Sequence, residues 1–160
     1  MIVPVKKKSL ELPDSNSALR DRAEAIQAAA DHIVSANRFV EPLPEHLEKA
    51  VFGLACCCGA ERLFWEREGV FITTAGYVGH SRNPSYEDVC SGDTGHTEVV
   101  LVFFDTGKTY YLNLFAALWE FYDLTQGMRQ GSDQGPQYRS VIYASRAKQA
   151  IAAKVSSEAF

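Results

Sequence analysis

Three consecutive cysteines, Cys56, Cys57 and Cys58, are the residues of this sequence best suited to chemistry. They lie between a short apolar run at residues 50–55 and a segment with helical character at residues 59–66. The sulfur of Cys56 should therefore lie near a helix N-terminus, where unpaired N–H groups and the helix dipole favour a thiolate. A thiolate is a nucleophile, so we expect Cys56 to be reactive. The alternative is that Cys56 packs as a small buried thiol.

Two long polar segments, at residues 78–97 and 123–137, could supply partners for this thiol, because long loops in a compact chain usually carry function. In or beside them lie Tyr86, Glu98, Asp133 and Tyr138. A thiol with nearby carboxyl and phenol groups has what nucleophilic attack coupled to proton donation requires. From the residues alone, Glu98 could equally form a salt bridge at a strand start. The two tyrosines could be packing phenols, and Asp133 could be a turn former.

The cysteine spacing argues against a disulfide framework and against a metal site. The fourth cysteine, Cys90, is distant in sequence, and adjacent cysteines form a disulfide only with strain. We therefore expect Cys57 and Cys58 to line the wall of the site rather than to form a disulfide with Cys56. Zinc ligands usually include a C-x2-C spacing, which is absent, so no metal is predicted.

Length and composition point to a single soluble domain. The chain has 160 residues, of which 46% are hydrophobic and 22% charged, and its formal charge is −4. This acidic balance disfavours binding to nucleic acid or to an anionic membrane. No apolar run approaches the length of a membrane span, and the N-terminus lacks the apolar core of a secretory signal. We expect a cytoplasmic protein and a monomer.

Hydrophobic periodicity predicts alternating helices and strands. Residues 17–37 are alanine-rich with apolar side chains at helical spacing, which predicts an amphipathic helix with Ser17 as its cap. Strands are predicted at residues 50–55, 69–77, 99–104 and 139–143, and further helices at 59–66, 109–122 and from 145. This order predicts an α+β fold with helices packed on a mixed sheet. Residues 1–48 are expected to form an N-terminal arm and residues 49–160 the domain.

Three ordered stretches resemble a known family. They are FGLACCCGAERLFW at residues 52–65, NPSYEDVCSGDTGHTEVV at 83–100 and TQGMRQGSDQGPQYRSVIY at 125–143. The chain is identified by them as similar to the peptide-methionine (S)-S-oxide reductases, the A-type methionine sulfoxide reductases. The resemblance implies a ferredoxin-like α/β sandwich and thiol-dependent reduction of L-methionine (S)-S-oxide, free or in oxidised proteins. It further implies no metal or organic cofactor and an external thiol reductant such as thioredoxin.

The resemblance also implies roles for individual residues. Cys56 falls at the attacking cysteine, and Glu98 at the acid that protonates the sulfoxide oxygen. Tyr86 and Tyr138 fall at the phenols that hydrogen-bond this oxygen, and Asp133 at a carboxylate that organises the pocket. The Cys56 sulfenic acid formed in the reaction must then be reduced by another thiol. Glu98 precedes six apolar residues, so we expect burial to favour its protonated form.

Two departures from the family pattern bear on activity. The family sequence Gly-Cys-Phe-Trp-Gly is replaced by residues 55–59, so that Cys57 and Cys58 stand at substrate-binding positions where two aromatic rings are usual. The sequence also ends at Phe160, before the tail that usually carries resolving cysteines. The alternative hypothesis is therefore an impaired or inactive relative that keeps the fold as a binding or structural module. We favour the enzyme, because the chemical groups remain.

Overall fold

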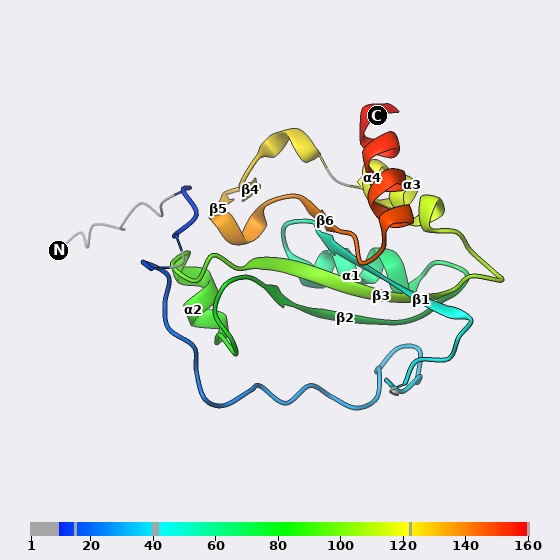
Figure 1. Cartoon of the computed structure of the whole chain (residues 1–160), viewed down its shortest axis with the longest axis horizontal. Coiled ribbons are helices and arrows are strands. Elements are labelled where there is room, and N and C mark those ends of the chain that lie inside the picture. The colour runs from blue at the N-terminus through cyan, green and yellow to red at the C-terminus, as the bar shows by residue number, and fades with distance from the viewer. Residues whose placement is uncertain (1–9, 15, 40–41, 122, 160) are drawn as a thin grey trace.

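A four-stranded sheet with helices packed against it organises the chain (Figure 1). The computed structural model describes residues 10–14, 16–39, 42–121 and 123–159. The strand order is β2-β3-β1-β6. The sheet strands are β1 (Leu47–Gly53), β2 (Val70–Val78), β3 (Thr97–Asp105) and β6 (Val141–Tyr143). The helices are α1 (Cys57–Trp65), α2 (Tyr86–Ser91), α3 (Tyr111–Phe121) and α4 (Ala147–Ala159), and a small hairpin pairs β4 (Arg129–Gln130) with β5 (Asp133–Gln134).

The core lies between one face of this sheet and the helices α1 and α3. Alternate residues of the central strands β1 and β3 point to this face, as the pleat of a strand requires. Phe52 of β1 is fully buried, with its ring centroid 5.1 Å from that of Phe64 on α1 and 5.8 Å from that of Phe115 on α3. Burying three such rings stabilises the fold by several kcal/mol, on the order of 2 kcal/mol each. This packing fixes α1 against the centre of the sheet.

The predicted α+β class, with helices packed on the sheet, is confirmed. All three strand pairings in the described sheet are antiparallel, where the sequence predicted a mixed sheet. The strands at 50–55, 69–77, 99–104 and 139–143 and the helices at 59–66, 109–122 and from 145 form with shifted ends. Within the described residues, every helix is too short or too polar to cross a lipid bilayer.

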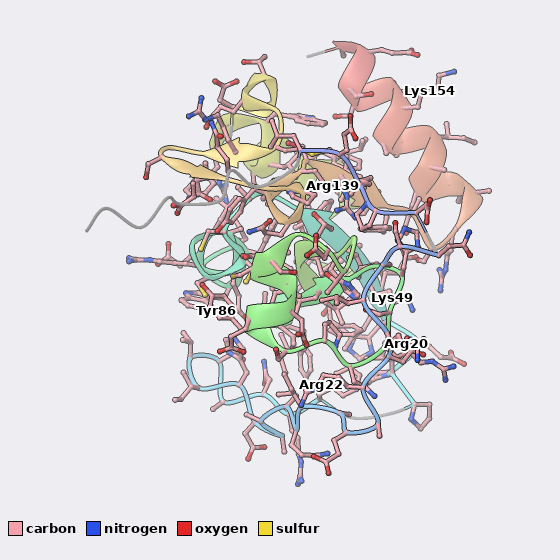
Figure 2. All side chains as sticks on the ribbon, turned by 90° about the vertical axis from the view of Figure 1, so that its left-hand side faces the viewer. Arg20, Arg22, Lys49, Tyr86, Arg139 and Lys154 are labelled. Atoms are coloured by element: carbon pink, nitrogen blue, oxygen red, sulfur yellow. The ribbon has the colours of Figure 1, made fainter. Side chains whose placement is uncertain are left out.

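Arg139 ties the segment that leads into β6 to the segment that leads into β3 (Figure 2). Its guanidinium donates to the carbonyl oxygens of His96 over 3.0 Å, Gly95 over 3.0 Å and Pro136 over 2.9 Å. A planar guanidinium suits this clamp because its donors are held in a fixed geometry. The residues adjoining Arg139 and those that begin β3 are thus held together.

The helix predicted at residues 17–37 does not form, and this prediction was wrong. Residues 16–39, here called the arm, follow bends and turns that pass the loop carrying α2 and then run along β2 (Figure 1). Leu19 N–H donates to the Asp93 carbonyl and Arg22 N–H to the Arg82 carbonyl, so these backbone groups are bonded across the chain. Ile33 is 97% exposed. Tertiary contacts therefore override the intrinsic helix propensity of the alanines.

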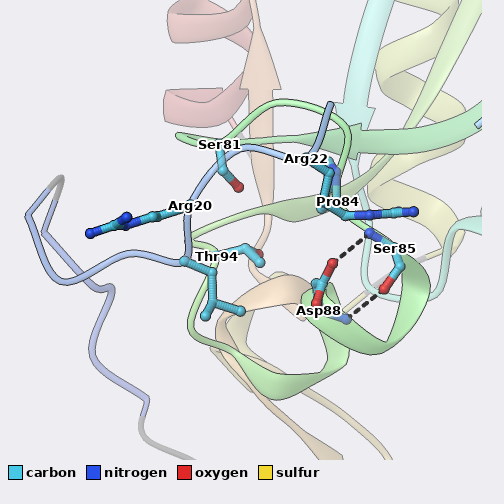
Figure 3. Close-up of a pocket in the computed structure, with 8 residues that line it drawn as sticks. Arg20, Arg22, Ser81, Pro84, Ser85, Asp88 and Thr94 are labelled. Carbon is cyan, nitrogen blue, oxygen red and sulfur yellow. Dashed lines mark hydrogen bonds between the residues drawn. The ribbon is translucent and has the colours of Figure 1, made fainter. Parts of the chain in front are cut away.

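Helix α2 lies within the segment at 78–97 that was predicted to be loop throughout, and this part of the prediction was also wrong. A capping box begins the helix: Asp88 N–H donates to Ser85 Oγ and Ser85 N–H donates to Asp88 Oδ2 (Figure 3). Gly92, with φ of 85°, ends it in the left-handed conformation that glycine adopts readily. A cavity of about 600 Å³ lies between the arm and α2, lined by Arg22, Ser85 and six further residues.

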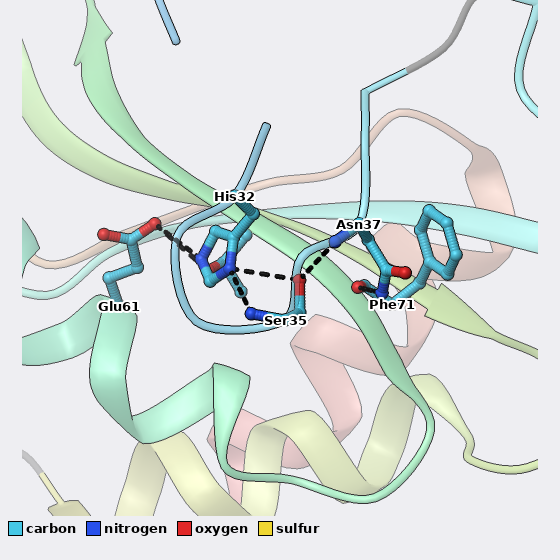
Figure 4. A network of polar contacts seen from close by, with 6 residues as sticks. His32, Ser35, Asn37, Glu61 and Phe71 are labelled. Atoms are coloured by element: carbon cyan, nitrogen blue, oxygen red, sulfur yellow. Dashed lines mark hydrogen bonds and ion pairs between the residues drawn. The ribbon is translucent and has the colours of Figure 1, made fainter. Parts of the chain in front are cut away.

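A polar network fastens the arm to the sheet and to α1 (Figure 4). Thr73 Oγ1 lies 3.0 Å from His32 Nε2 and donates to Glu61 Oε1 over 3.0 Å. His32 Nδ1 accepts from Ser35 N–H over 3.0 Å, so the ring is bonded on both sides. The Asn37 amide also donates to the Phe71 carbonyl. Glu61 of α1 therefore serves the attachment of the arm.

Candidate functional site

Cys56 immediately precedes α1 and is its N-cap residue. Its carbonyl accepts the first helical hydrogen bond, from Ala60 N–H over 3.2 Å, while its own backbone is extended. Ala55, just before it, has φ of 61°, a left-handed conformation that costs an L-residue about 1–2 kcal/mol. This turn places the half-buried Cys56 side chain at the positive end of the helix.

The β4–β5 hairpin reaches the same turn. Gln130 of β4 places its Oε1 2.5 Å from the Cys56 backbone nitrogen, which donates to it. Cys56 N–H is one of the groups that α1 itself leaves without a partner, so a side chain from a distant loop satisfies it. Residues 129–134 are thereby held beside the start of α1.

The next residue, Cys57, joins α1 to β3. Its backbone N–H donates to Glu98 Oε2 over 3.0 Å, and both side chains are buried. Burial, and then the neighbouring Glu98 carboxyl, raise the pKa of the Cys57 thiol. Cys57 therefore stays protonated at neutral pH and is a poor nucleophile. Cys58, one residue further, is exposed.

Tyr77 of β2 is a residue of this site that the sequence did not single out. It pairs directly with Glu98 across the two strands. Burial raises the pKa of Tyr77 to about 12, with smaller effects from Cys57 and Glu98. Only the register between β2 and β3 reveals this neighbour, because Tyr77 and Glu98 are separated by the whole α2 segment.

Tyr86, the first residue of α2, lies at the rim of the site and is 58% exposed. A hydrogen bond with the Cys90 thiol, one helical turn later, is the main cause that raises the pKa of Tyr86 to about 12. Tyr138 and Glu98 raise it further, which places the Tyr86 phenol within electrostatic reach of both.

Tyr138 ends the 3₁₀ turn Pro136–Tyr138 and is half-buried. Burial, then Glu98 and then Asp133, raise the pKa of Tyr138. Asp133 of β5 is exposed, and it influences the Tyr138 phenol without a hydrogen bond to it. The clamp of Arg139 on the carbonyls before β3 holds this turn close to Glu98.

The structure thus gathers most of the sequence-predicted residues around one point. Cys56 is the N-cap of α1, and Glu98 accepts a hydrogen bond from the N–H of Cys57, the first residue of the helix. Tyr138 and Tyr86 lie within electrostatic reach of the Glu98 carboxyl. Within this arrangement Asp133 has an electrostatic effect on Tyr138. The Cys58 side chain is exposed to solvent.

All four cysteines are free thiols. Among the residues that the structure describes, no three His, Cys, Asp or Glu side chains gather as metal ligands would. What the arrangement offers is a thiol at a helix N-terminus, a buried carboxyl and phenols whose raised pKa keeps them as hydrogen-bond donors. These groups suit nucleophilic attack by sulfur on a centre whose oxygen needs protonation.

Sequence comparison assigns this arrangement to a family. The family model described as "Peptide methionine sulfoxide reductase" matches residues 48–160. The chain belongs to the peptide methionine sulfoxide reductase family. It is 51% identical over 152 residues to the peptide methionine sulfoxide reductase MsrA of Azotobacter vinelandii, covering 94% of this chain and 70% of that protein. It is 48% identical over 154 residues to MsrA 1 of Caulobacter vibrioides, covering 96% and 71%.

Solved structures of the reductase family agree with this assignment. Methionine sulfoxide reductase A of Corynebacterium diphtheriae superposes with a TM-score of 0.82 at 35% identity, covering 92% of this chain and 69% of that chain. Mxr1 of Saccharomyces cerevisiae in its reduced form gives a TM-score of 0.65 at 26% identity, covering 72% and 69%. The α+β fold implied by the family resemblance is therefore confirmed.

Proposed function

We propose that this reductase-family chain converts L-methionine (S)-S-oxide, free or in oxidised proteins, to methionine. The observation that carries the proposal is the 3.0 Å hydrogen bond from Cys57 N–H to Glu98 Oε2. It fixes a buried carboxyl beside the helix N-terminus at which Cys56 lies, so a thiolate and an acid can act on one sulfoxide group.

The first step is attack of the Cys56 thiolate on the sulfoxide sulfur. The positive end of α1 stabilises this thiolate. Cys57 does not compete with it, since burial and Glu98 raise the pKa of its thiol. A bond forms between the Cys56 sulfur and the substrate sulfur, and electrons move toward the sulfoxide oxygen.

The oxygen must be protonated before it can leave the substrate sulfur. The Glu98 carboxyl is the proton donor, and the phenols of Tyr86 and Tyr138 hydrogen-bond the oxygen as negative charge develops on it. Asp133 acts electrostatically on Tyr138, and it helps to organise the pocket rather than to transfer a proton. The hydroxyl group then moves from the substrate sulfur to the Cys56 sulfur while the bond between the two sulfurs breaks, which releases methionine and leaves a Cys56 sulfenic acid.

Recycling requires a thiol from outside the site. The sulfenic acid condenses with a thiol to give a disulfide and water, and a second thiol restores Cys56. Thioredoxin is a reductant of the right chemical class. Thiol attack and acid-assisted loss of oxygen need no metal or organic cofactor, and free cysteines suit a reducing compartment such as the cytoplasm.

Cys57 and Cys58 lie where the family has two rings, so we propose that they form a thinner wall for the substrate methyl group. Replacing the two rings with cysteines changes the surface that binds the substrate, and it leaves the Cys56 thiol and the Glu98 carboxyl in place. The relatives reported above are reductases by name, and they give no support to the alternative of an inactive binding module.

The proposal is tested by steady turnover of a peptide with either epimer of methionine sulfoxide, using excess dithiol. We expect reduction of the S epimer by the unaltered chain, none of the R epimer, and none of either by Cys56→Ser. Equal inactivity of the unaltered chain and Cys56→Ser would contradict the proposal, and so would conversion of the R epimer.

A further inference from the structure

Strand β2 forms one edge of the sheet. Because β2 pairs with β3 alone, every second residue of β2 directs its backbone N–H and C=O away from the sheet. Asp105 N–H donates to the Gly69 carbonyl over 2.8 Å, which identifies the odd-numbered residues of β3 as those that bond to β2. Following the register from there, Gly76 bonds to β3, and its neighbours Ala75 and Tyr77 direct their backbone groups to the free edge.

The edge is open at Ala75 and Tyr77. No described residue outside the sheet forms a hydrogen bond with the N–H or C=O of either one. Gly76, between them, has open space beside it, since a Cβ at this position would contact nothing within 4 Å. A row of unpaired N–H and C=O groups on an edge strand is a template for pairing with another extended chain.

The arm closes the same edge further back along β2. Thr73 is 1% exposed, and His32 of the arm lies against it with Nε2 3.0 Å from Thr73 Oγ1 (Figure 4). The Asn37 side chain occupies the next carbonyl that faces the edge, that of Phe71. A groove of about 370 Å³ lies here, lined by residues of the arm, of α1 and of β2 up to Ala75. The open part of the edge therefore leads into this groove at one end.

At its other end the open edge reaches the candidate active site. Tyr77 lies directly opposite Glu98 in the pairing of β2 with β3, so the two side chains are on one face of the sheet. This is the face on which Glu98 accepts from Cys57 N–H at the start of α1. A strand added outside β2 would lie two strand spacings, about 10 Å, from the backbone of Glu98. Its side chain opposite Tyr77 would point to the same face.

We propose that the edge of β2 at Ala75 and Tyr77 binds the main chain of an oxidised protein as an added strand, with the methionine sulfoxide opposite Tyr77 and its side chain directed to Cys56. In this binding mode main-chain hydrogen bonds supply the affinity, whatever the neighbouring sequence. Such binding suits a substrate that oxidation creates in many different sequences. The inference rests on the proposed function, and it names extended protein segments as the preferred substrate over the free amino acid.

Amide hydrogen exchange tests the binding mode without turnover. It is measured by NMR on Cys56→Ser, alone and with a saturating peptide that carries methionine (S)-S-oxide at its centre. We expect exchange of the Ala75 and Tyr77 amides to slow about tenfold when the peptide binds, because each gains a hydrogen bond. Gly76 N–H, already bonded to β3, is the internal reference.

Two results of this measurement would overturn the proposal. One is an unchanged exchange rate at Ala75 and Tyr77 in the presence of the peptide. The other is protection of these amides that appears without peptide and grows with protein concentration, which would assign the edge to a second copy of the chain.

Methylated peptides test the main-chain contacts from the substrate side. N-methylation of one peptide bond removes a single donor and keeps every side chain. We expect kcat/KM to fall about tenfold when the methyl group is on the methionine sulfoxide or on the residue two positions along, on one side only. Methylation of the residue between should have little effect, because alternate N–H groups of a strand point in opposite directions. Equal effects at all three positions, or none at any, would contradict an added strand.

A substitution in β2 removes one of the proposed donors from the protein. Proline is tolerated on an edge strand where the missing N–H faces away from the sheet, so Ala75→Pro is compared with Ala75→Ser, which keeps the N–H. We expect the ratio of kcat/KM for the peptide to that for free L-methionine (S)-S-oxide to fall about tenfold in Ala75→Pro alone. The same ratio in both variants would overturn the proposal.

The methylated peptides decide the matter if Ala75→Pro does not fold, because they need no altered protein. They also separate this inference from the proposed function. Reduction of both substrates with no effect of methylation would exclude the added strand alone, whereas reduction of neither substrate by the unaltered chain would exclude the proposed function.

Discussion

The backbone N–H of Cys57 and the Glu98 carboxylate form a 3.0 Å hydrogen bond that joins the start of α1 to the start of β3. Both side chains are buried, and Cys56 is the preceding residue in the chain. A carboxyl that is 4% exposed is thereby held beside the first residue of α1. Acid and thiol are positioned by the same helix end.

Glu98→Gln should abolish most of the activity while the fold is kept. The amide oxygen of glutamine can still accept from Cys57 N–H, but the side chain no longer supplies a proton. We expect the rate of a single turnover to fall by about 100-fold or more, the usual contribution of a general acid. Glu61→Gln is the control, since Glu61 lies on α1 and accepts a hydrogen bond from Thr73 rather than from Cys57. Stopped-flow measurement of methionine release checks this, and an unchanged rate in Glu98→Gln would exclude it as the acid.

Restoring a ring at the site should tighten substrate binding. Cys58 is exposed beside Cys56, so Cys58→Trp adds an apolar surface for the substrate methyl group without crowding the core. An aromatic ring can bury about 150–250 Å², and we expect KM to fall about tenfold. Cys58→Ser is the control. A KM equal to that of Cys58→Ser would mean that this position does not contact substrate.

The neighbouring substitution, Cys57→Phe, should behave differently. Cys57 is 7% exposed and lies against Glu98, so a ring there overpacks the start of α1. We expect a loss of about 1–3 kcal/mol in the free energy of unfolding, measured by urea titration. Unchanged stability would show that this part of the site has room for a ring.

Tyr111→Phe should stabilise the protein, most of all in alkali. The Tyr111 hydroxyl is buried without a hydrogen bond, and burial raises the pKa of Tyr111 to about 12 from 10.0. Between these values the unfolded chain has lost this proton and the folded chain has not, so the free energy of unfolding falls as pH rises. We expect Tyr111→Phe to gain about 1 kcal/mol below pH 10 and to reduce the loss above it.

Urea unfolding at several pH values between 8 and 12 measures both effects. Tyr110→Phe is the control, because Tyr110 is 72% exposed and its hydroxyl is free to contact water. Equal alkaline loss in Tyr111→Phe and the unaltered chain would show that other groups dominate the pH dependence.

The parts of the fold predicted from sequence are those that a buried, periodic segment determines. The apolar residues of β3 are buried on both faces, and Glu98 lies at the start of that strand as the pattern indicated. Cys56 was placed at a helix N-terminus because an apolar strand and a helical segment flank it, and it is the N-cap of α1. Both positions follow from the order of apolar and helical segments along the chain, so one sequence was enough to predict them.

What sequence reasoning missed depends on contacts between distant segments. The arm had the composition of a helix, but bonds such as Arg22 N–H to the Arg82 carbonyl hold it in an open path. The start of α2 did leave a local signal, since Ser85 and Asp88 have the spacing of a capping box. Tyr77 left none, because only the register between β2 and β3 brings it to Glu98.

The attack of Cys56 is tested most directly in a single turnover without any added reductant. A peptide carrying the S epimer is mixed with the reduced chain and a reagent that traps sulfenic acids, and each cysteine is then analysed by mass spectrometry. We expect one methionine released per chain, with the trapped sulfenic acid, or a disulfide formed from it, on Cys56. Release of methionine with Cys56 unmodified and the label on Cys58 or Cys90 would contradict the assignment of the nucleophile.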